Sequence, residues 1–293
     1  MASVPMRLSL FGGGSDLFPG GRVISAAINP RIYVTQIYRE HGWKLVYGGK
    51  VEEVDDPYAI EHDQIRNHVI RISEDPCEIH VHSELPDSAG LGSSSSVAVA
   101  LALLAMRFHK NPYLMDVASY AWENEKIVHT VGWQDHYGAA HPGINYWFDV
   151  AGGIMRQPLP DWIEVFDRIQ LWKAPVRTHG AAMVLKSYTQ QGDMASIADR
   201  ALVIGPKNIP ALGALLNESW ELKKAMSPHV STPQIDHMIE RLLNNGAVGA
   251  KLCGAGNGGF VMTLAEEPIT KWLGYEEVPF EVNWKGANVT LCE

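Results

Sequence analysis

A loop rich in glycine and serine separates a predicted strand from a predicted helix, and it limits what this chain can be. After the strand-like run 78–85 the chain bends at Pro86, passes Gly90 and Gly92, and enters an Ala/Leu/Val-rich helix at 93–108 through four consecutive serines. The first N–H groups of a helix have no partner inside it, and glycine lets an anion approach the backbone. Because one serine would suffice as an N-cap, the whole loop favours a phosphate site.

Two other segments, Gly12–Gly14 and Gly254–Gly259, are also rich enough in glycine to approach an anion. The chain contains no GxxxxGK[S/T] segment, which excludes a P-loop of the Walker type. The later segment matches GxGxxG, but the strand-like run Phe260–Leu264 follows it, whereas a dinucleotide-binding loop opens a helix. This segment is therefore compatible with a tight hairpin or with an anion-binding loop.

Helical and strand patterns alternate irregularly along the chain. Strands are expected at 7–11, 23–39, 43–47, 78–85, 144–148, 154–157, 250–253 and 260–264, and helices at 61–72, 93–108, 114–129, 181–190, 194–203, 209–226 and 233–244. The strand at 43–47 is expected to pair with the strand before it across the turn His41-Gly42. A length of 293 residues suits two domains, and the segment 159–175, which carries Pro and Trp, is the candidate boundary. The pattern predicts an α+β fold with two lobes, 1–170 and 171–293.

Composition and charge limit which molecules the protein is expected to bind and in which cellular compartment it is expected to work. Hydrophobic residues make up 46% of the chain and charged residues 19%, enough to bury a sizeable core. The formal net charge of −9 gives no general attraction for nucleic acid or anionic lipid, so neither is expected as a partner. The longest apolar run, Val97–Met106, is ten residues long, half of the about 20 needed to span a bilayer. Three widely spaced cysteines and an N-terminus without signal-peptide features favour a cytoplasmic protein.

Three motifs occur in an order that resembles the GHMP kinases, the superfamily of galactokinase, homoserine kinase and mevalonate kinase. They are RLSLFGGGSD at 7–16, PDSAGLGSSSS at 86–96 and KLCGAGNGG at 251–259, and the resemblance covers residues 6 to about 265. It implies a ribosomal-protein-S5-like N-terminal lobe and a ferredoxin-like C-terminal lobe. It also implies a kinase that uses ATP and Mg²⁺ and transfers phosphate to an alcohol group of a small molecule.

The same resemblance implies roles for individual residues. Asp135, expected in a loop after the helix 114–129, aligns with the base, and Arg7 with a cation that keeps the base ionised. Ser94 and Glu125 align with the magnesium ligands, which are hard oxygen donors. The implied nucleotide-binding residues are Pro86, Gly90, Leu91, Gly92, Ser93, Ser94, Ser95 and Ser96. The implied substrate-binding residues are Gly12, Gly13, Gly14, Ser15, Asp16, Gly254, Gly256 and Gly258.

A closer resemblance bears on which molecule accepts the phosphate group. The segments 12–16, 90–96, 134–137 and 222–236 resemble D-glycero-D-manno-heptose 7-phosphate kinases, whereas GWQD at 132–135 equally resembles L-fucokinases. The first resemblance implies phosphorylation of the anomeric hydroxyl of a heptose or heptose 7-phosphate, giving a sugar 1-phosphate. An L-fucokinase-like enzyme acting on a 6-deoxyhexose and a catalytically silent sugar sensor are the alternatives. A 7-phosphate would need cations, for which Arg177, Lys186 and Lys251 are the candidates, and the chain is expected to be a monomer or homodimer.

Overall fold

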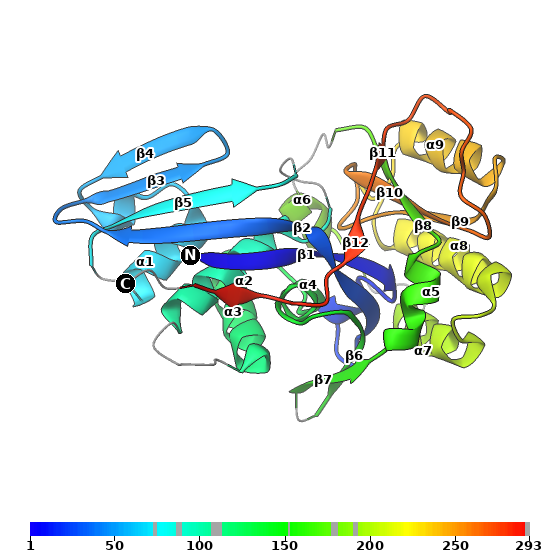
Figure 1. The fold of residues 1–293 in the computed structure, drawn as a ribbon, viewed down its shortest axis with the longest axis horizontal. Coiled ribbons are helices and arrows are strands. Elements are labelled where there is room, and N and C mark those ends of the chain that lie inside the picture. The colour runs from blue at the N-terminus through cyan, green and yellow to red at the C-terminus, as the bar shows by residue number, and fades with distance from the viewer. Residues whose placement is uncertain are drawn as a thin grey trace.

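The computed structural model describes residues 1–72, 75–85, 90–106, 113–151, 153–176, 181–189 and 193–290. Within these ranges the chain forms two β-sheets with helices packed against them (Figure 1). The strands are β1 (Ala2–Phe11), β2 (Arg22–Tyr38), β3 (Trp43–Tyr47), β4 (Lys50–Val54), β5 (Cys77–Ser83), β6 (Ile144–Val150), β7 (Gly153–Pro158), β8 (Ile169–Lys173), β9 (Ala247–Leu252), β10 (Phe260–Ala265), β11 (Glu277–Val278), β12 (Glu281–Val282) and β13 (Asn288–Val289). The α-helices are α1 (Asp63–Ile72), α2 (Ser93–Ala105), α3 (Leu114–Val128), α4 (Gln134–Ala140), α5 (Ile163–Phe166), α6 (Ala181–Lys186), α7 (Met194–Ile204), α8 (Ile209–Met226) and α9 (Pro233–Leu243).

The larger sheet has the strand order β13-β1-β2-β5-β3-β4, and β6 extends it from the first half of β2. Strand β1 is buried along almost its whole length, although its sequence ASVPMRLSLF alternates apolar and polar residues. The polar face is not solvent-exposed, because Arg7 and Ser9 on it line a cavity inside the protein. Helix α2 packs on β1 and β2 and contacts α3 and α4. This packing holds the start of α2, the middle of β1 and the start of α4 close together.

One predicted strand pairing is wrong. Strand β3 does not pair with β2 across His41-Gly42; it pairs in parallel with β5 and antiparallel with β4. The reason is that β5 occupies the edge of β2 from Ile32 to Tyr38, so β3 can join the sheet only beyond β5.

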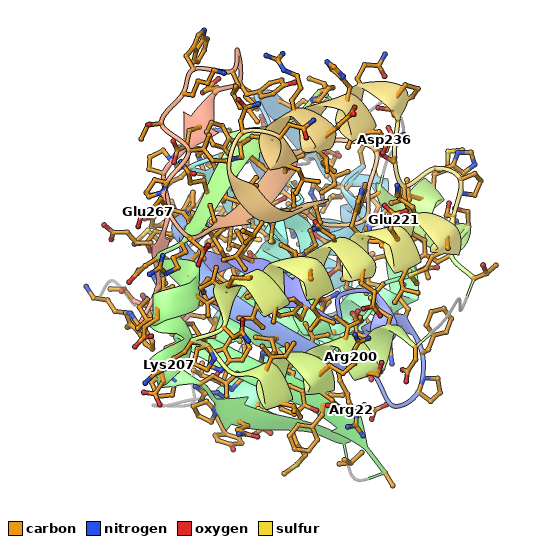
Figure 2. All side chains as sticks on the ribbon, turned by 90° about the vertical axis from the view of Figure 1, so that its right-hand side faces the viewer. Arg22, Arg200, Lys207, Glu221, Asp236 and Glu267 are labelled. Carbon is orange, nitrogen blue, oxygen red and sulfur yellow. The ribbon has the colours of Figure 1, made fainter. Side chains whose placement is uncertain are left out.

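The smaller sheet has the order β11-β8-β10-β9, and α8 and α9 pack against β9. Its strand β8 lies inside the segment that was expected to be a lobe boundary. The outer side of this part carries charged residues, with Arg200 on α7 and Glu221 on α8 labelled in Figure 2. Arg200 pairs with Glu218 and thereby links α7 to α8 at the surface.

The α+β class predicted from the element order is confirmed, while the division at residue 170 stays a prediction. The end of the chain does not remain with the smaller sheet, because β12 pairs with β2 and β13 with β1 (Figure 1). Strands of two residues carry no periodic signal, so the sequence could not show this return. Across the described ranges, no helix combines the length and the apolar character required to cross a bilayer.

Candidate active site

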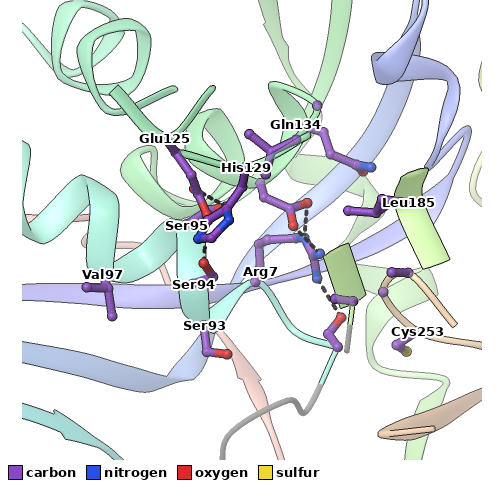
Figure 3. A pocket seen from close by; sticks show the side chains of 18 of the residues that line it. Arg7, Ser93, Ser94, Ser95, Val97, Glu125, His129, Gln134, Leu185 and Cys253 are labelled. Atoms are coloured by element: carbon purple, nitrogen blue, oxygen red, sulfur yellow. Dashed lines mark hydrogen bonds and ion pairs between the residues drawn. The ribbon is translucent and has the colours of Figure 1, made fainter. Parts of the chain in front are cut away.

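A cavity of about 860 Å³ is lined by residues from both sheets and from the helices that cover them. The lining includes Arg7 of β1, the start of α2 and Asp135 of α4, together with Lys223 of α8 and Lys251 of β9. At one end the lining reaches the β3–β4 turn at 47–49 and the start of α1. Figure 3 shows Arg7, Ser94, Glu125 and Gln134 around the centre.

The N-terminus of α2 opens onto this cavity without a side-chain cap. Gly92 is the N-cap, with φ 78° and ψ 23°, a left-handed conformation that glycine adopts without strain. Ser93, Ser94 and Ser95 line the cavity, and by helix geometry their N–H groups have no partner inside the helix. The serines are therefore not caps, and the turn presents backbone donors to the cavity, as an anion site requires.

Glu125 is the centre of a buried hydrogen-bond network at the start of α2. Its Oε1 accepts from the Ser94 hydroxyl at 2.6 Å and from Gln64 Nε2 at 2.6 Å. Its Oε2 accepts from the Ser95 hydroxyl at 3.0 Å and lies 2.6 Å from His136 Nε2. Burial alone would raise the pKa of Glu125, but His136 and the serine hydroxyls lower it below its ordinary value. The carboxyl group is thus held ionised beside a serine hydroxyl, which is a pair of hard oxygen ligands.

Arg7 and Asp135 form a two-pronged ion pair at the cavity wall. Arg7 Nε donates to Asp135 Oδ1 and Nη2 to Oδ2, both at 2.6 Å, while Nη1 donates to the Gly90 carbonyl at 2.8 Å. Burial would lower the pKa of Arg7, but the adjacent Asp135 raises it above its ordinary value. Asp135 lies in the first turn of α4, not in the predicted loop. That helix is only seven residues long, too short for a periodic pattern to reveal it.

Asp16 is held beside this pair by amide groups. Its Oδ1 accepts from Gln134 Nε2 at 2.7 Å and from the Gly14 N–H at 3.0 Å. Gln134 is itself oriented by Ser9, whose hydroxyl donates to Gln134 Oε1 at 2.8 Å. Burial, followed by the charge of Asp135, raises the pKa of Asp16 to about 6. Gly132 is required next to it, because a Cβ there would lie 1.7 Å from Asp16 Oδ2.

The structure brings most of the predicted site residues to one cavity. Those that line it are Arg7, Gly13, Gly14, Asp16, Gly90, Gly92, Ser93, Ser94, Ser95, Glu125, Asp135 and Gly254. Those that do not are Gly12, Ser15, Leu91, Ser96, Gly256 and Gly258. Pro86 and Arg177 fall outside the described residues, and Lys186 is exposed.

Three of the residues away from the cavity have structural roles instead. Ser96 is fully buried and donates its hydroxyl to the Pro5 carbonyl, which ties α2 to β1. The Ser15 hydroxyl donates to the Gly12 carbonyl and closes the turn after β1. Gly256 packs against Val230, where a Cβ would approach the backbone to 2.8 Å. A motif therefore mixes residues that face the cavity with residues that shape the loop.

Sequence reasoning missed several residues that line the cavity, namely Ser9, Gln64, Lys223 and the turn 47–49. Gln64 lies on an amphipathic helix and Lys223 in the last turn of α8, where a polar residue is ordinarily solvent-exposed. Lys223 falls within the segment 222–236, which resembles heptose 7-phosphate kinases, but nothing local indicated that its side chain or that of Gln64 reaches the cavity, since both depend on contacts with distant segments. Gln134 belongs to the segment 134–137, which resembles heptose 7-phosphate kinases. Only its neighbour Asp135, the implied base, indicated that Gln134 would lie near the site.

Comparisons with known proteins identify the family of this chain. The model of the GHMP kinases N terminal domain matches residues 59–143, and that of the GHMP kinases C terminal domain matches residues 200–271. A D-glycero-alpha-D-manno-heptose 7-phosphate kinase of Campylobacter jejuni is 26% identical, with 92% of this chain and 89% of that protein covered. A mevalonate kinase of Aeropyrum pernix is 30% identical, with 91% and 88% covered. The crystal structure of a D-glycero-D-manno-heptose 1-phosphate kinase from Bacteroides thetaiotaomicron superposes with a TM-score of 0.74 at 22% identity, covering 100% and 99%.

Residues of both matched segments line the cavity, and the glycine–serine turn of α2 falls within the first segment. The resemblance inferred from the three motifs is thereby confirmed, together with the fold that it implies. The chain belongs to the GHMP kinases and is a phosphotransferase whose acceptor is an alcohol.

Proposed function

We propose that this enzyme is an ATP- and Mg²⁺-dependent sugar kinase that phosphorylates the anomeric hydroxyl of a manno-configured heptose or its 7-phosphate. The product would be the sugar 1-phosphate. The observation that carries the proposal is the arrangement of two carboxyl groups in one cavity, Asp135 paired with Arg7 and Asp16 held by Gln134. The first suits a base and the second suits a ligand for neighbouring hydroxyl groups.

The proposed chemistry uses these residues in defined ways. The anomeric oxygen attacks the terminal phosphorus of ATP, the new O–P bond forms as the bridging P–O bond breaks, and ADP leaves. Asp135 takes the hydroxyl proton, because each carboxylate oxygen retains a lone pair beyond the one used by Arg7. An anomeric hydroxyl is more acidic than an ordinary alcohol, so a carboxylate can serve as the base. Arg7 keeps Asp135 oriented and adds positive charge beside the reacting oxygen.

The start of α2 fits the nucleotide phosphates and a magnesium ion. Ser94 and Glu125 would hold the ion, since their oxygens are hard donors, they lie 2.6 Å apart and the carboxyl group is ionised. When bound, Mg²⁺ neutralises charge on the phosphates. The backbone N–H groups of Ser93 to Ser95 would meet phosphate oxygens, and the small side chains of Gly90 and Gly92 leave space for them.

Turnover of a panel of acceptors tests the proposal. Heptose, heptose 7-phosphate, fucose, mannose, galactose and mevalonate are each incubated with Mg²⁺ and ATP, and phosphorus NMR locates the new phosphate. The expected product is a heptose 1-phosphate, whose phosphorus couples to the anomeric proton. Turnover of fucose alone would favour an L-fucokinase-like enzyme, turnover of mevalonate alone would exclude a sugar kinase, and sugar binding without turnover would indicate a sensor.

Removing the Ser94 hydroxyl is expected to weaken magnesium binding without unfolding the enzyme. Ser94→Ala loses one proposed ligand but no helix cap, because Gly92 is the N-cap. The magnesium concentration that gives half-maximal turnover should rise about 10–100-fold. Ser93→Ala, one residue earlier in the same turn, is the control and should leave this concentration unchanged. Equal magnesium dependence in both variants would remove Ser94 from the proposed ligands.

The raised pKa of Asp16 predicts weaker acceptor binding in mild acid. The carboxyl group must be ionised to accept two hydroxyl hydrogen bonds, and its pKa is raised to about 6. As pH falls through 6 the group gains a proton, so the KM for the acceptor should rise while the Kd for the nucleotide stays constant. Measuring both between pH 5 and 7 with heptose, which carries no phosphate, checks this, and Asp16→Asn should remove the change in KM near pH 6. A KM independent of pH in the parent enzyme would contradict the assignment.

A further inference from the structure

Two buried lysines line the cavity, and among the described residues neither forms an ion pair with a carboxylate. Lys223 is 7% exposed and Lys251 is 4% exposed, and both line the cavity. Lys223 Nζ donates to the Gly254 carbonyl, and Lys251 Nζ donates to the Leu10 carbonyl at 2.6 Å. Within the described part of the chain, neither ammonium group has a carboxylate oxygen within 4.0 Å.

Such groups are costly unless an anion compensates them. An ammonium group loses its hydration on burial, and one backbone carbonyl each does not replace it. Burial lowers the pKa of Lys251 to about 7 and that of Lys223 to about 8, and the charge of Lys223 contributes to the lower value of Lys251. A bound anion would raise the pKa of both lysines and offset their mutual repulsion. The positive charge in this part of the cavity is therefore uncompensated until an anion binds.

The two lysines belong to the acceptor end of the cavity. The carbonyls that they contact precede the Gly12–Asp16 segment and begin the Gly254 loop. The carboxylates that act electrostatically on Lys223 are those of Asp16 and Asp135. By contrast, Ser94 and Glu125, the proposed magnesium ligands, contact each other at the start of α2, and neither forms a hydrogen bond with the two lysines.

We propose that Lys223 and Lys251 form an oxyanion subsite that binds a phosphate or carboxylate group of the acceptor molecule. This inference rests on the proposed function and narrows it to acceptors that already carry a negative charge, which favours heptose 7-phosphate over heptose. Arg7 does not serve this subsite, because its guanidinium is taken up by Asp135 and the Gly90 carbonyl. Among the described residues that line the cavity, Lys223 and Lys251 are therefore the lysine or arginine side chains left to bind an anion.

Steady-state kinetics with matched acceptors tests the subsite. Lys223→Met and Lys251→Met keep an unbranched apolar side chain of nearly the same length and remove its charge. With saturating Mg²⁺ and ATP, each should raise the KM for heptose 7-phosphate about 10–100-fold, as expected for the loss of one charged hydrogen bond. The KM for heptose without phosphate should stay within about threefold. Mevalonate, which carries a carboxylate, shows whether the bound group is a phosphate or a carboxylate.

Lys224→Met is the control, because Lys224 is next to Lys223 on α8 but pairs with Glu221 at the surface. It should match the parent enzyme with every acceptor. The inference is overturned if Lys223→Met and Lys251→Met weaken charged and uncharged acceptors equally, or if neither weakens any. Melting temperatures of the two variants confirm that both are folded, and each of them tests the subsite independently.

A direct binding experiment separates this inference from the proposed function. Calorimetry with inorganic phosphate is done while adenylyl imidodiphosphate and Mg²⁺ fill the nucleotide site. The parent enzyme and Lys224→Met should bind phosphate, and the other two variants should bind it at least about 10-fold more weakly. Absence of binding to the parent enzyme overturns the subsite even if heptose is a substrate. Binding that depends on both lysines supports it even if no heptose is turned over.

Discussion

Asp135→Asn is expected to lower turnover about 10²–10⁴-fold while leaving nucleotide binding intact, since removing a general base typically costs that much. The asparagine amide cannot take the acceptor's proton. It can still accept one hydrogen bond from Arg7, but its NH₂ group then faces a second donor of the guanidinium. Because Arg7 is 4% exposed, this mismatch should also lower the free energy of unfolding by about 1–3 kcal/mol.

The chain offers a close control for this substitution. Asp199 is also an aspartate paired with an arginine, Arg22, but that pair lies at the surface and does not line the cavity. Asp199→Asn should change turnover by less than about threefold. Turnover is measured with a saturating acceptor, and nucleotide affinity by calorimetry. An Asp135→Asn enzyme as active as Asp199→Asn would show that the proton goes elsewhere.

Those features of the site that depend on local backbone chemistry were predictable from the sequence. Glycines followed by serines at the start of an apolar helix indicate an anion site regardless of the rest of the fold. Gly12–Asp16 similarly indicated an acidic residue after a flexible turn, and the structure places Asp16 in the cavity. The resemblance to the GHMP kinases rested on these local segments, and the family matches confirm it.

What could not be predicted depends on contacts between distant segments. Helix α4 and strand β12 are too short to produce a hydrophobic period, so their existence becomes visible only in the folded chain. The burial of Lys223 depends on the Gly254 loop, 31 residues further along the chain, which accepts its hydrogen bond. The network that orients Asp16 likewise joins Ser9 to Gln134 across 125 residues. A single sequence contains no signal that links such positions.

The four serines at 93–96 show both what the sequence could predict and what it could not. The sequence correctly indicated that four serines exceed what a cap needs, and none of them caps α2. The serine pattern alone could not divide them by role, because that division follows from what each side chain faces, and only the family resemblance singled out Ser94. Ser94 and Ser95 contact Glu125, whereas Ser96 contacts the Pro5 carbonyl. The contact with Glu125 explains why a carboxylate can be buried at the start of this helix.

Glu125→Gln is expected to impair both stability and magnesium dependence. The carboxylate is 2% exposed and is surrounded by donors from Gln64, Ser94 and Ser95, with His136 as the fourth neighbour. A glutamine would turn its NH₂ group toward some of these donors and remove the negative charge that they stabilise. Breaking a buried charged network of this kind costs about 3–5 kcal/mol of folding free energy. Loss of a proposed metal ligand should also raise the magnesium requirement for turnover about 10–100-fold.

Glu123→Gln separates a general effect on α3 from the specific effect of Glu125. Glu123 lies on the same helix, and its carboxylate pairs with Lys126 at the surface. This variant should retain the stability and magnesium dependence of the parent enzyme. Urea unfolding gives the stability of both variants, and turnover is measured over a range of magnesium concentrations. If Glu125→Gln loses stability but keeps the parent magnesium dependence, Glu125 only supports the turn, and the ion must be held by other residues of the cavity.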